Sequence, residues 1–448
     1  RPVTIMYPDK KVIIEAKLFS IGFTKYNEMY SKLVHSLEMI ESQLPAEIHY
    51  NFGLRTIIRI VDLAAKKFSS LKETNEEKII FQSTIEILSK SLNEEDMQEM
   101  KKILLSFFIG MSSQGLEDEI NLEHPSLIIN PKIRAKVMEV RQALDNNAGV
   151  IIYGSTFSAK SKILMLATQL KPATEIEVIN PKAMERGDLF GTSDCSNTGW
   201  MDGLLSKIFK DFSINSCEGD QIIKFDGPMD MGWIENFNTV LDVHNILCLE
   251  SCESFYISPS IKFVFEAGNL DKVSPATVSR CSVVFIDENC LTWKEIFLAW
   301  FNKIKEETWL ENHDVLLKQL FEWILPPLLE TVKKCKMAAQ VNAKNLVQCS
   351  LQLFDILLNE ALPNLKERKY LRGWIQVCIA RFKRICEALT KMNPTSKLSV
   401  FCQNRLLLGN LFCLVSLQDH FQSRSRSTHR FPYFRDYPVY DFKQYNIT

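Results

Sequence analysis

The pattern of hydrophobic positions divides the chain into three parts. From residue 11 to 110, apolar side chains recur at three- and four-residue spacing, which predicts helices, for instance through Tyr30–Leu44 and Leu54–Phe68. Asn93 stands before three acidic residues, a typical helix start, because the helix dipole stabilises carboxylates in a first turn. The glycine- and serine-rich run Gly110–Gly115 predicts the end of this helical part.

Between residues 121 and 290 the pattern changes to short β-prone runs. The runs that predict strands are Gly149–Tyr153, Glu175–Ile179, Gln221–Phe225, Ile261–Phe265 and Val283–Ile286. Helical patterns lie between several of these runs, at Lys162–Leu170 and Gly203–Phe212. Such alternation predicts a parallel sheet with helices on both faces.

Long amphipathic patterns return from residue 291 to about 420, for instance through Leu316–Leu325 and Leu346–Leu358. They predict a second helical region, which Pro326 and the proline after it interrupt. The most apolar late segment, Leu406–Leu417, is too short to span a bilayer, so we expect a buried helix there.

Composition narrows the class of protein. A length of 448 residues predicts several domains, and 46% hydrophobic with 24% charged residues excludes a disordered chain. The net charge of −1 provides no general attraction to nucleic acid or to an anionic membrane, and we expect neither as a partner. No secretion signal is visible, and the 12 cysteines lack metal-site spacing, so we expect a cytoplasmic protein with reduced thiols.

The loop after the first predicted strand carries the clearest chemistry. It lies between strand and helix and is close to the phosphate-binding pattern G-x-x-x-x-G-K-[ST], in which backbone N–H groups and the helix N-terminus wrap phosphates. Lys160 would neutralise the β- and γ-phosphates, and Ser161 would ligate Mg²⁺. The residues predicted to bind nucleotide here are Gly154, Ser155, Thr156, Phe157, Ser158, Ala159, Lys160 and Ser161.

Two residues of this loop depart from the pattern. Phe157 and Ala159 each add a side chain where glycine would permit a positive φ or a close approach to phosphate. Ala159 is small enough to be tolerated, whereas Phe157 at the loop tip is the larger obstacle. The sequence therefore leaves open whether the loop still binds a nucleotide.

Polar residues after later strands could complete the site. Asp226 ends a β-prone run. In nucleotide-binding sites an acid at the end of a strand holds the water shell of Mg²⁺, and Asp226 could have this role or could be a turn aspartate. Gly227 follows it and cannot act as a base, and Glu235 lies too far along the chain, so we expect bound ATP to stay intact. Asn269 could sense a γ-phosphate or be a loop residue. Arg280 could reach a neighbouring module's γ-phosphate or lie solvated at the surface.

Several segments together resemble the heavy chains of axonemal dyneins. They are Asn180–Ala183, Gly199–Ser206, Phe225–Asp242, Leu247–Ser251 and Ser274–Cys281. In that family the series marks the second AAA+ module of the motor ring. The stretch from Arg1–Asp9 through His49–Arg55 resembles the end of the first module and its helical lid.

The resemblance implies an α/β AAA+ P-loop core flanked by two all-α helical lid regions. Its expected parts are a lid of the preceding module at 1–115, the core of the second module at 121–290, that module's lid at 291–420, and an irregular tail at 421–448.

The resemblance also implies a function. The module would bind ATP and Mg²⁺ through the loop, Asn269 and Asp226, with little or no hydrolysis, and whether this segment is itself an enzyme stays open. Arg280 matches the family's arginine finger toward the preceding module, and Arg55 matches a sensor arginine in that module's lid. The implied partners are neighbouring AAA+ modules of the same heavy chain, dynein intermediate and light chains, and microtubules reached through the full-length motor of a ciliary or flagellar axoneme.

Departures from the family keep other interpretations open. Besides Phe157 and Ala159, relatives have glycine where this chain has Cys252 and Ser282, which indicates a divergent member, a short isoform or a fragment. One alternative is an autonomous AAA+ ATPase, which requires a catalytic acid beside Asp226. The other is a scaffold whose P-loop has decayed.

Overall fold

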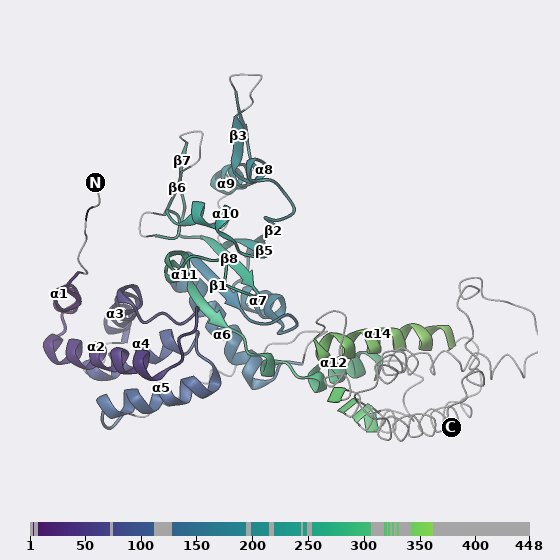
Figure 1. Cartoon of the computed structure of the whole chain (residues 1–448), viewed down its shortest axis with the longest axis horizontal. Coiled ribbons are helices and arrows are strands. Elements are labelled where there is room, and N and C mark those ends of the chain that lie inside the picture. The colour runs from purple at the N-terminus through teal and green to yellow at the C-terminus, as the bar shows by residue number, and fades with distance from the viewer. Residues whose placement is uncertain are drawn as a thin grey trace, which may run out of the picture. The chain divides into compact units, whose positions relative to one another are not determined.

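The structure is a computed structural model of the chain, drawn in Figure 1. Two compact units make up the chain, Arg1–Ala299 and Trp300–Thr448. The residues that the structure describes are 3, 8–71, 75–111, 128–193, 199–214, 219–242, 245–248, 253–305, 318–319, 321–322, 325–326, 329–330 and 342–361.

The first unit begins with a block of helices, which lie together in Figure 1. These helices are α1 (Lys10–Ile21), α2 (Tyr26–Gln43), α3 (Leu54–Leu71), α4 (Glu76–Leu88) and α5 (Glu94–Phe107). Their apolar faces form one buried cluster, which includes Leu18, Met29 and Phe81. The helices predicted at Tyr30–Leu44 and Leu54–Phe68 are therefore confirmed, with boundaries shifted by a few residues.

Short polar side chains begin these helices. Asp9 accepts a hydrogen bond from the amide of Lys11 at 2.9 Å, and Asn75 accepts one from the amide of Lys78 at 3.3 Å. Each bond satisfies an amide that has no partner inside the helix. Asn93 is the N-cap residue of α5, which confirms the predicted helix start.

The centre of the first unit is a sheet of five parallel strands, arranged in the order β2–β5–β8–β1–β9. The strands are β1 (Gly149–Tyr153), β2 (Glu175–Ile179), β5 (Gln221–Asp226), β8 (Ile261–Ala267) and β9 (Ser282–Phe285). Each corresponds to one of the predicted runs. The predicted α/β core with a parallel sheet is confirmed.

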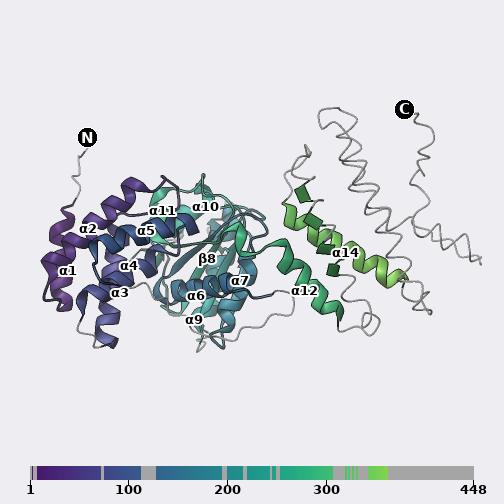
Figure 2. The same ribbon diagram turned by 90° about the horizontal axis from the view of Figure 1, so that it is seen from below.

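Alternating side chains of the strands are buried under helices on both faces of the sheet. Val150 and Ile152 join a cluster with α6 (Pro131–Asn146) and α7 (Lys160–Gln169), which lie together beside the sheet in Figure 2. Ile151 points to the opposite face and joins a second cluster. The helices that contribute to this second cluster are α8 (Arg186–Phe190), α9 (Leu204–Ile214), α10 (Met231–Ile234), the 3₁₀ helix η1 (Glu235–Phe237) and α11 (Pro275–Arg280). The core thus has three layers.

Two small antiparallel hairpins were not predicted from the sequence. One pairs β3 (Gly191–Ser193) with β4 (Trp200–Asp202), and the other pairs β6 (Ile246–Cys248) with β7 (Ser254–Tyr256). Each strand has three residues, which is too short for an alternating pattern to identify.

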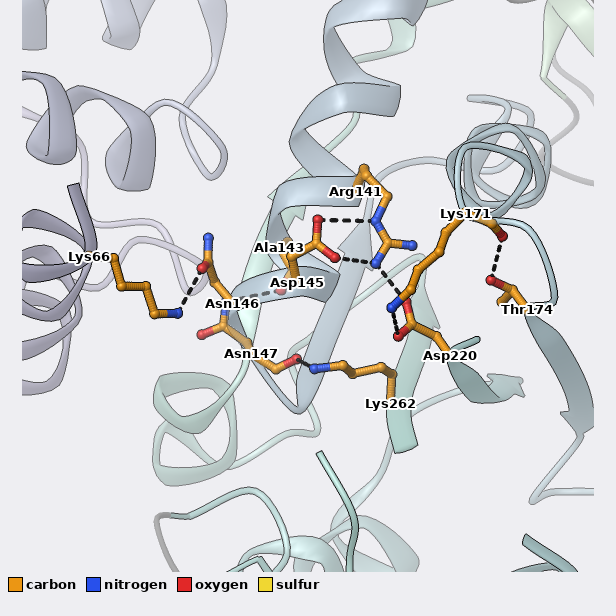
Figure 3. A network of polar contacts seen from close by, with 10 residues as sticks. All are labelled: Lys66, Arg141, Ala143, Asp145, Asn146, Asn147, Lys171, Thr174, Asp220 and Lys262. Atoms are coloured by element: carbon orange, nitrogen blue, oxygen red, sulfur yellow. Dashed lines mark hydrogen bonds and ion pairs between the residues drawn. The ribbon is translucent and has the colours of Figure 1, made fainter. Parts of the chain in front are cut away.

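A buried network of charges ties α6 and α7 to the sheet (Figure 3). Asp220 precedes β5 and is 3% exposed. Its carboxylate accepts hydrogen bonds from Arg141 of α6 and from Lys171 after α7, both at 2.6 Å. Burial alone would raise the pKa of Asp220, but hydrogen bonds from Lys171 and Arg141 outweigh it, so this pKa lies below its usual value.

Less of the C-terminal half is described. After β9 come the 3₁₀ helix η2 (Glu288–Cys290) and α12 (Trp293–Lys305), and the second unit contains α14 (Ala343–Ala361), which confirms the helix predicted at Leu346–Leu358. The rings of Trp300, Phe321 and Phe354 contact one another there.

Several predictions fall on residues outside the described ranges. They are Leu406–Leu417, the tail 421–448, most of the linker at Gly110–Gly115, half of the helical pattern at Leu316–Leu325, and Cys252. Within the described ranges, no helix combines the length and apolar composition needed to cross a membrane.

Candidate functional site

The predicted phosphate loop joins β1 to α7 at the carboxyl edge of the sheet. Gly154 opens it, and its amide donates to the Ala267 carbonyl at the end of β8, 3.2 Å away. A Cβ at residue 154 would come within 2.4 Å of the Ile286 carbonyl oxygen. Only glycine fits there, so the first residue of the motif is required by close packing of the backbone.

The two residues that depart from the glycine-rich pattern adopt the conformation of glycine. Phe157 has φ 66° and Ala159 has φ 70°, both in the left-handed region. This region costs an L-residue roughly 1 to 2 kcal/mol. The tertiary structure therefore holds these two residues in a backbone conformation that glycine adopts more easily.

Lys160 is the first residue of α7, and its side chain lies over the loop. Its ammonium donates to the carbonyl oxygens of Gly154 at 2.9 Å and Ser155 at 2.7 Å. Burial lowers the pKa of Lys160, and the nearby carboxylates of Glu266 and Asp226 oppose that shift. Within the described structure the Ser155 hydroxyl is buried without a hydrogen-bond partner, which leaves one polar atom of the loop available to a ligand.

Two carboxylates stand beside the loop where β5 and β8 end. Asp226 is the last residue of β5 and pairs in register with Glu266 of β8. The Ser161 hydroxyl donates to Glu266 at 2.8 Å, so the predicted Mg²⁺ ligand Ser161 contacts this glutamate in place of Asp226. The side chain of Asp226 is 55% exposed and that of Glu266 is 6% exposed.

Sequence reasoning missed Glu266 and a second residue of this corner, Lys224. The Lys224 ammonium is 2.9 Å from Glu266 Oε1 and 3.3 Å from Asp226 Oδ2, and its side chain is 10% exposed. Strand alternation could have signalled this contact, because Lys224 and Asp226 lie two residues apart and so share one face of β5. What the sequence did not provide is the pairing of β5 with β8.

The side chains at this corner do not fit a Mg²⁺ ion. Mg²⁺ keeps several waters and needs oxygen ligands that are free to take it. Here a lysine ammonium contacts both carboxylates. The Ser161 hydroxyl donates its proton to Glu266 and keeps its oxygen lone pairs, so the ammonium and not the hydroxyl opposes a metal ion. Among the residues described, no three His, Cys, Asp or Glu side chains are grouped to hold a metal ion.

Asn269 lies two residues beyond β8, close to the start of the loop. Its side chain is occupied in a local turn, where it accepts from the Asp271 amide and donates to the Asp271 carboxylate, both at 2.7 Å. The structure thus brings Asn269 to the loop edge but directs its amide group to Asp271. Its predicted role as a γ-phosphate sensor stays a prediction.

The two predicted arginines meet at the opposite edge of the sheet. Arg55 of α3 donates to the Ser279 hydroxyl at 2.8 Å and lies 3.9 Å from Asp242. Arg280, the last residue of α11, is 3.3 Å from the same carboxylate. Residues 225 positions apart in the chain therefore share Asp242, which sequence reasoning had not singled out as a site residue.

This arginine pair is separated from the phosphate loop by the length of a strand. Ser282, two residues after Arg280, pairs with Val150 near the start of β1, whereas the loop follows the end of β1. A five-residue strand spans roughly 15 Å. Arg55 and Arg280 thus lie at the end of the sheet away from the phosphate loop.

A cavity of about 130 Å³ lies between the helical block and the core. Its lining includes Arg59, Asp62, Lys66 and Lys90, and none of the predicted phosphate-loop residues. This cavity is therefore not the predicted nucleotide site.

Comparisons with known proteins agree with this architecture. Residues 1–161 match the family described as "Hydrolytic ATP binding site of dynein motor region", and residues 317–403 match "Dynein heavy chain AAA lid domain". The lid match supports the helical lid expected in the C-terminal part.

Individual relatives cover most of this chain. Rat dynein axonemal heavy chain 12 is 30% identical over 363 residues, which cover 76% of this chain and 12% of the relative. Human dynein axonemal heavy chain 3 is 28% identical over 379 residues, covering 80% of this chain and 9% of the relative. Mouse dynein axonemal heavy chain 1 is 28% identical over 386 residues, covering 81% of this chain and 9% of the relative. The chain thus spans 12% or less of the length of these relatives. These matches, together with the α/β core, support the assignment of this chain as a segment of a dynein heavy chain.

Proposed function

We propose that the first unit contains an AAA+ module of a dynein motor that binds ATP and holds it without hydrolysis. The observation that carries this proposal is the backbone of the phosphate loop. Phe157 and Ala159 keep left-handed φ values although neither is glycine. Such a conformation turns successive amides toward one point, which is the arrangement that binds an anion.

The side chains around the loop support nucleotide binding. Lys160 lies over the loop and could exchange its carbonyl partners for phosphate oxygens. The buried Ser155 hydroxyl offers a further polar contact. The N-terminus of α7 adds amides without intrahelical partners and a favourable dipole.

The proposed absence of hydrolysis rests on the positions and contacts of the carboxylates nearest to the loop. A general base needs a free lone pair within reach of the attacking water. Gly227 follows Asp226, and a Cβ there would come within 2.8 Å of the Asn180 side-chain oxygen. Glu266 is the nearest buried carboxylate, and we do not assign it as the base. Ser161 donates to one of its oxygens, and the other, Oε1, lies 2.9 Å from the Lys224 ammonium in an ion pair without hydrogen-bond geometry.

A second part of the proposal concerns the arginines. Arg280 would act as an arginine finger toward the nucleotide of the preceding module, and Arg55 as a sensor arginine of that module's lid. Their position at the sheet edge away from the phosphate loop supports this assignment, as does their common contact with Asp242. An arginine finger stabilises charge that develops on the transferred phosphate.

The remaining proposals concern the whole motor. The axonemal relatives support a role in ciliary or flagellar movement within an axoneme. The expected partners are neighbouring AAA+ modules, dynein intermediate and light chains, and microtubules reached through the full-length motor.

The test is an ATP titration of the full chain, followed by chromatography of the bound nucleotide. We expect saturable binding and recovery of intact ATP. Lys160→Ala should weaken binding by about tenfold or more, because a buried ammonium beside the phosphates is lost. Lys207→Ala is the matched control, since Lys207 lies on α9, on the other face of the sheet.

Two other outcomes would favour the alternatives. Steady phosphate release that Lys160→Ala abolishes would indicate an autonomous AAA+ ATPase. No binding at about 1 mM ATP would indicate a scaffold with a decayed P-loop.

A further inference from the structure

A lysine ammonium lies between the two carboxylates at the carboxyl ends of β5 and β8. Lys224 Nζ donates a hydrogen bond to Asp226 Oδ2 at 3.3 Å. It is also 2.9 Å from Glu266 Oε1, an ion-pair distance without hydrogen-bond geometry. The side chains of Lys224 and Glu266 are 10% and 6% exposed, so this is a buried ion pair at the edge of the nucleotide site.

The register of the sheet creates this arrangement. Lys224 and Val264 are direct partners, as are Asp226 and Glu266. Val264 belongs to the cluster under α6 and α7, so Glu266, two residues further along, lies on that same face. Ser161 reaches this face from the first turn of α7 and donates to the second oxygen of Glu266 at 2.8 Å.

The contacts at this corner leave little room for a divalent ion. A metal there would need oxygens from Ser161 and from a water shell held by Asp226. The Lys224 ammonium already contacts the Asp226 carboxylate that would hold this shell. Ser161 donates its proton to Glu266 and keeps its oxygen lone pairs, so the obstacle is the ammonium. Bringing a divalent cation beside the ammonium would add like-charge repulsion in a partly desolvated site.

We infer that Lys224 is the built-in cation of this site and that Mg²⁺ does not tighten nucleotide binding to this module. The inference rests on the proposed function, since it concerns the same phosphate loop. In this arrangement Lys160 lies over the loop and the Lys224 ammonium supplies positive charge beside Ser161. The ligand class is a nucleoside triphosphate without its metal.

A purely structural ion pair would hold β5 to β8 without affecting the metal requirement. The two roles are separated by measuring binding, because a structural pair predicts that Mg²⁺ still tightens ATP binding. The decisive readout is therefore the ratio of the dissociation constants in excess EDTA and in Mg²⁺.

The experiment titrates the full chain with ATP by calorimetry, once with Mg²⁺ and once with excess EDTA. For the natural chain we expect dissociation constants that differ by less than about threefold, or weaker binding with Mg²⁺. Lys224→Met frees the two carboxylates, so Mg²⁺ should then tighten binding by about tenfold. Lys262→Met is the matched control, because Lys262 is a buried lysine of the neighbouring strand β8, near Asn147 at the other end of the sheet (Figure 3).

Two further variants separate an effect on the Mg²⁺ dependence of binding from an effect on folding. Lys224→Met leaves Glu266 buried without its cation, which can destabilise the core. The double variant Lys224→Met with Glu266→Gln removes that charge and should also become Mg²⁺-dependent. Lys224→Arg keeps a cation and should stay independent of Mg²⁺.

The outcomes separate the two proposals. Binding by the natural chain that Mg²⁺ tightens by more than about threefold would overturn the role of Lys224 and leave the proposed function intact. Metal-independent binding by both folded Lys224→Met variants would also overturn it. No ATP binding in either buffer would overturn the proposed function and this inference together.

Discussion

The guanidinium of Arg59 donates to the main-chain carbonyl of Arg280 at 2.6 Å. The same group donates to the carbonyls of Ser279 at 3.0 Å and Cys281 at 2.9 Å. These carbonyls end α11 and have no partners inside the helix, so a cation from α3 caps them. Arg59 stands one turn after Arg55, and α3 thereby holds the segment that carries Arg280 against the helical block.

Arg59→Met should destabilise the first unit by about 2 kcal/mol, because partly buried carbonyls lose charged donors. The free energy of unfolding in urea measures this effect, and amide exchange should rise in α11. Arg55→Met is the control on the same helix. Arg55 is 43% exposed in its side chain, so its loss should cost less than about 1 kcal/mol. Equal losses for both variants would contradict the capping role.

Arg280→Ala should abolish most ATP turnover in the full-length motor, by about 10³-fold, if Arg280 is an arginine finger. The folding of this chain should change by less than about 1 kcal/mol, because the contact with Asp242 is partly exposed. Steady-state phosphate release and urea unfolding measure the two effects. Arg280→Lys keeps the charge without the planar fork and should recover only part of the rate. An unchanged motor rate would refute the role.

His49 should make the stability of the first unit depend on pH. The ring is 4% exposed among Tyr50, Tyr153 and Phe285, and neither nitrogen has a hydrogen-bond partner in the described structure. Burial lowers the pKa of His49 from 6.5 to about 4. The unfolded chain therefore takes up a proton at higher pH than the folded chain, and stability falls as the pH drops from about 6.5 to about 4.

The size of this effect is about 3 kcal/mol across that interval. His49→Phe keeps an aromatic ring and removes the titration, so it should flatten this part of the curve. Urea unfolding at pH 7, 5.5 and 4 compares the two chains. His35→Phe is the control, because His35 lies on the exposed side of α2. An identical pH dependence in His49→Phe would show that other groups cause the loss.

Asp220→Asn should destabilise the core by about 3 to 5 kcal/mol, because Arg141 and Lys171 lose the buried carboxylate that they share. Thermal or urea unfolding of the chain measures the loss. Asp145→Asn provides a comparison at the other partner of Arg141, since Asp145 is 53% exposed and its removal should cost less than about 1 kcal/mol. A small loss in Asp220→Asn would indicate that solvent reaches the network.

The sequence predicted the elements of the fold well because their signals are local. Each of the five sheet strands was found within two residues of its bounds, and Asn93 was identified as a helix start. The segment Gly154–Ser161 was predicted to connect a strand to a helix, because the spacing of its glycine, lysine and serine can be read directly from the sequence. The two three-residue hairpins were missed, since so few residues carry no periodic signal.

The tertiary structure decided the chemistry of the site. Pairing of β5 with β8 places Lys224 against Glu266, and packing of α3 on α11 places Arg55 beside Arg280. These contacts join residues distant in sequence, so no spacing along the chain predicts them. The loop shows the same principle, because residue preference favours glycine at 157 and 159 whereas the surrounding core holds Phe157 and Ala159 in the left-handed region. Local residue preferences determined the helices and strands. Only the packing of these elements determined which charges meet, because a charge is stable in the interior only beside partners that the fold brings within a few ångströms.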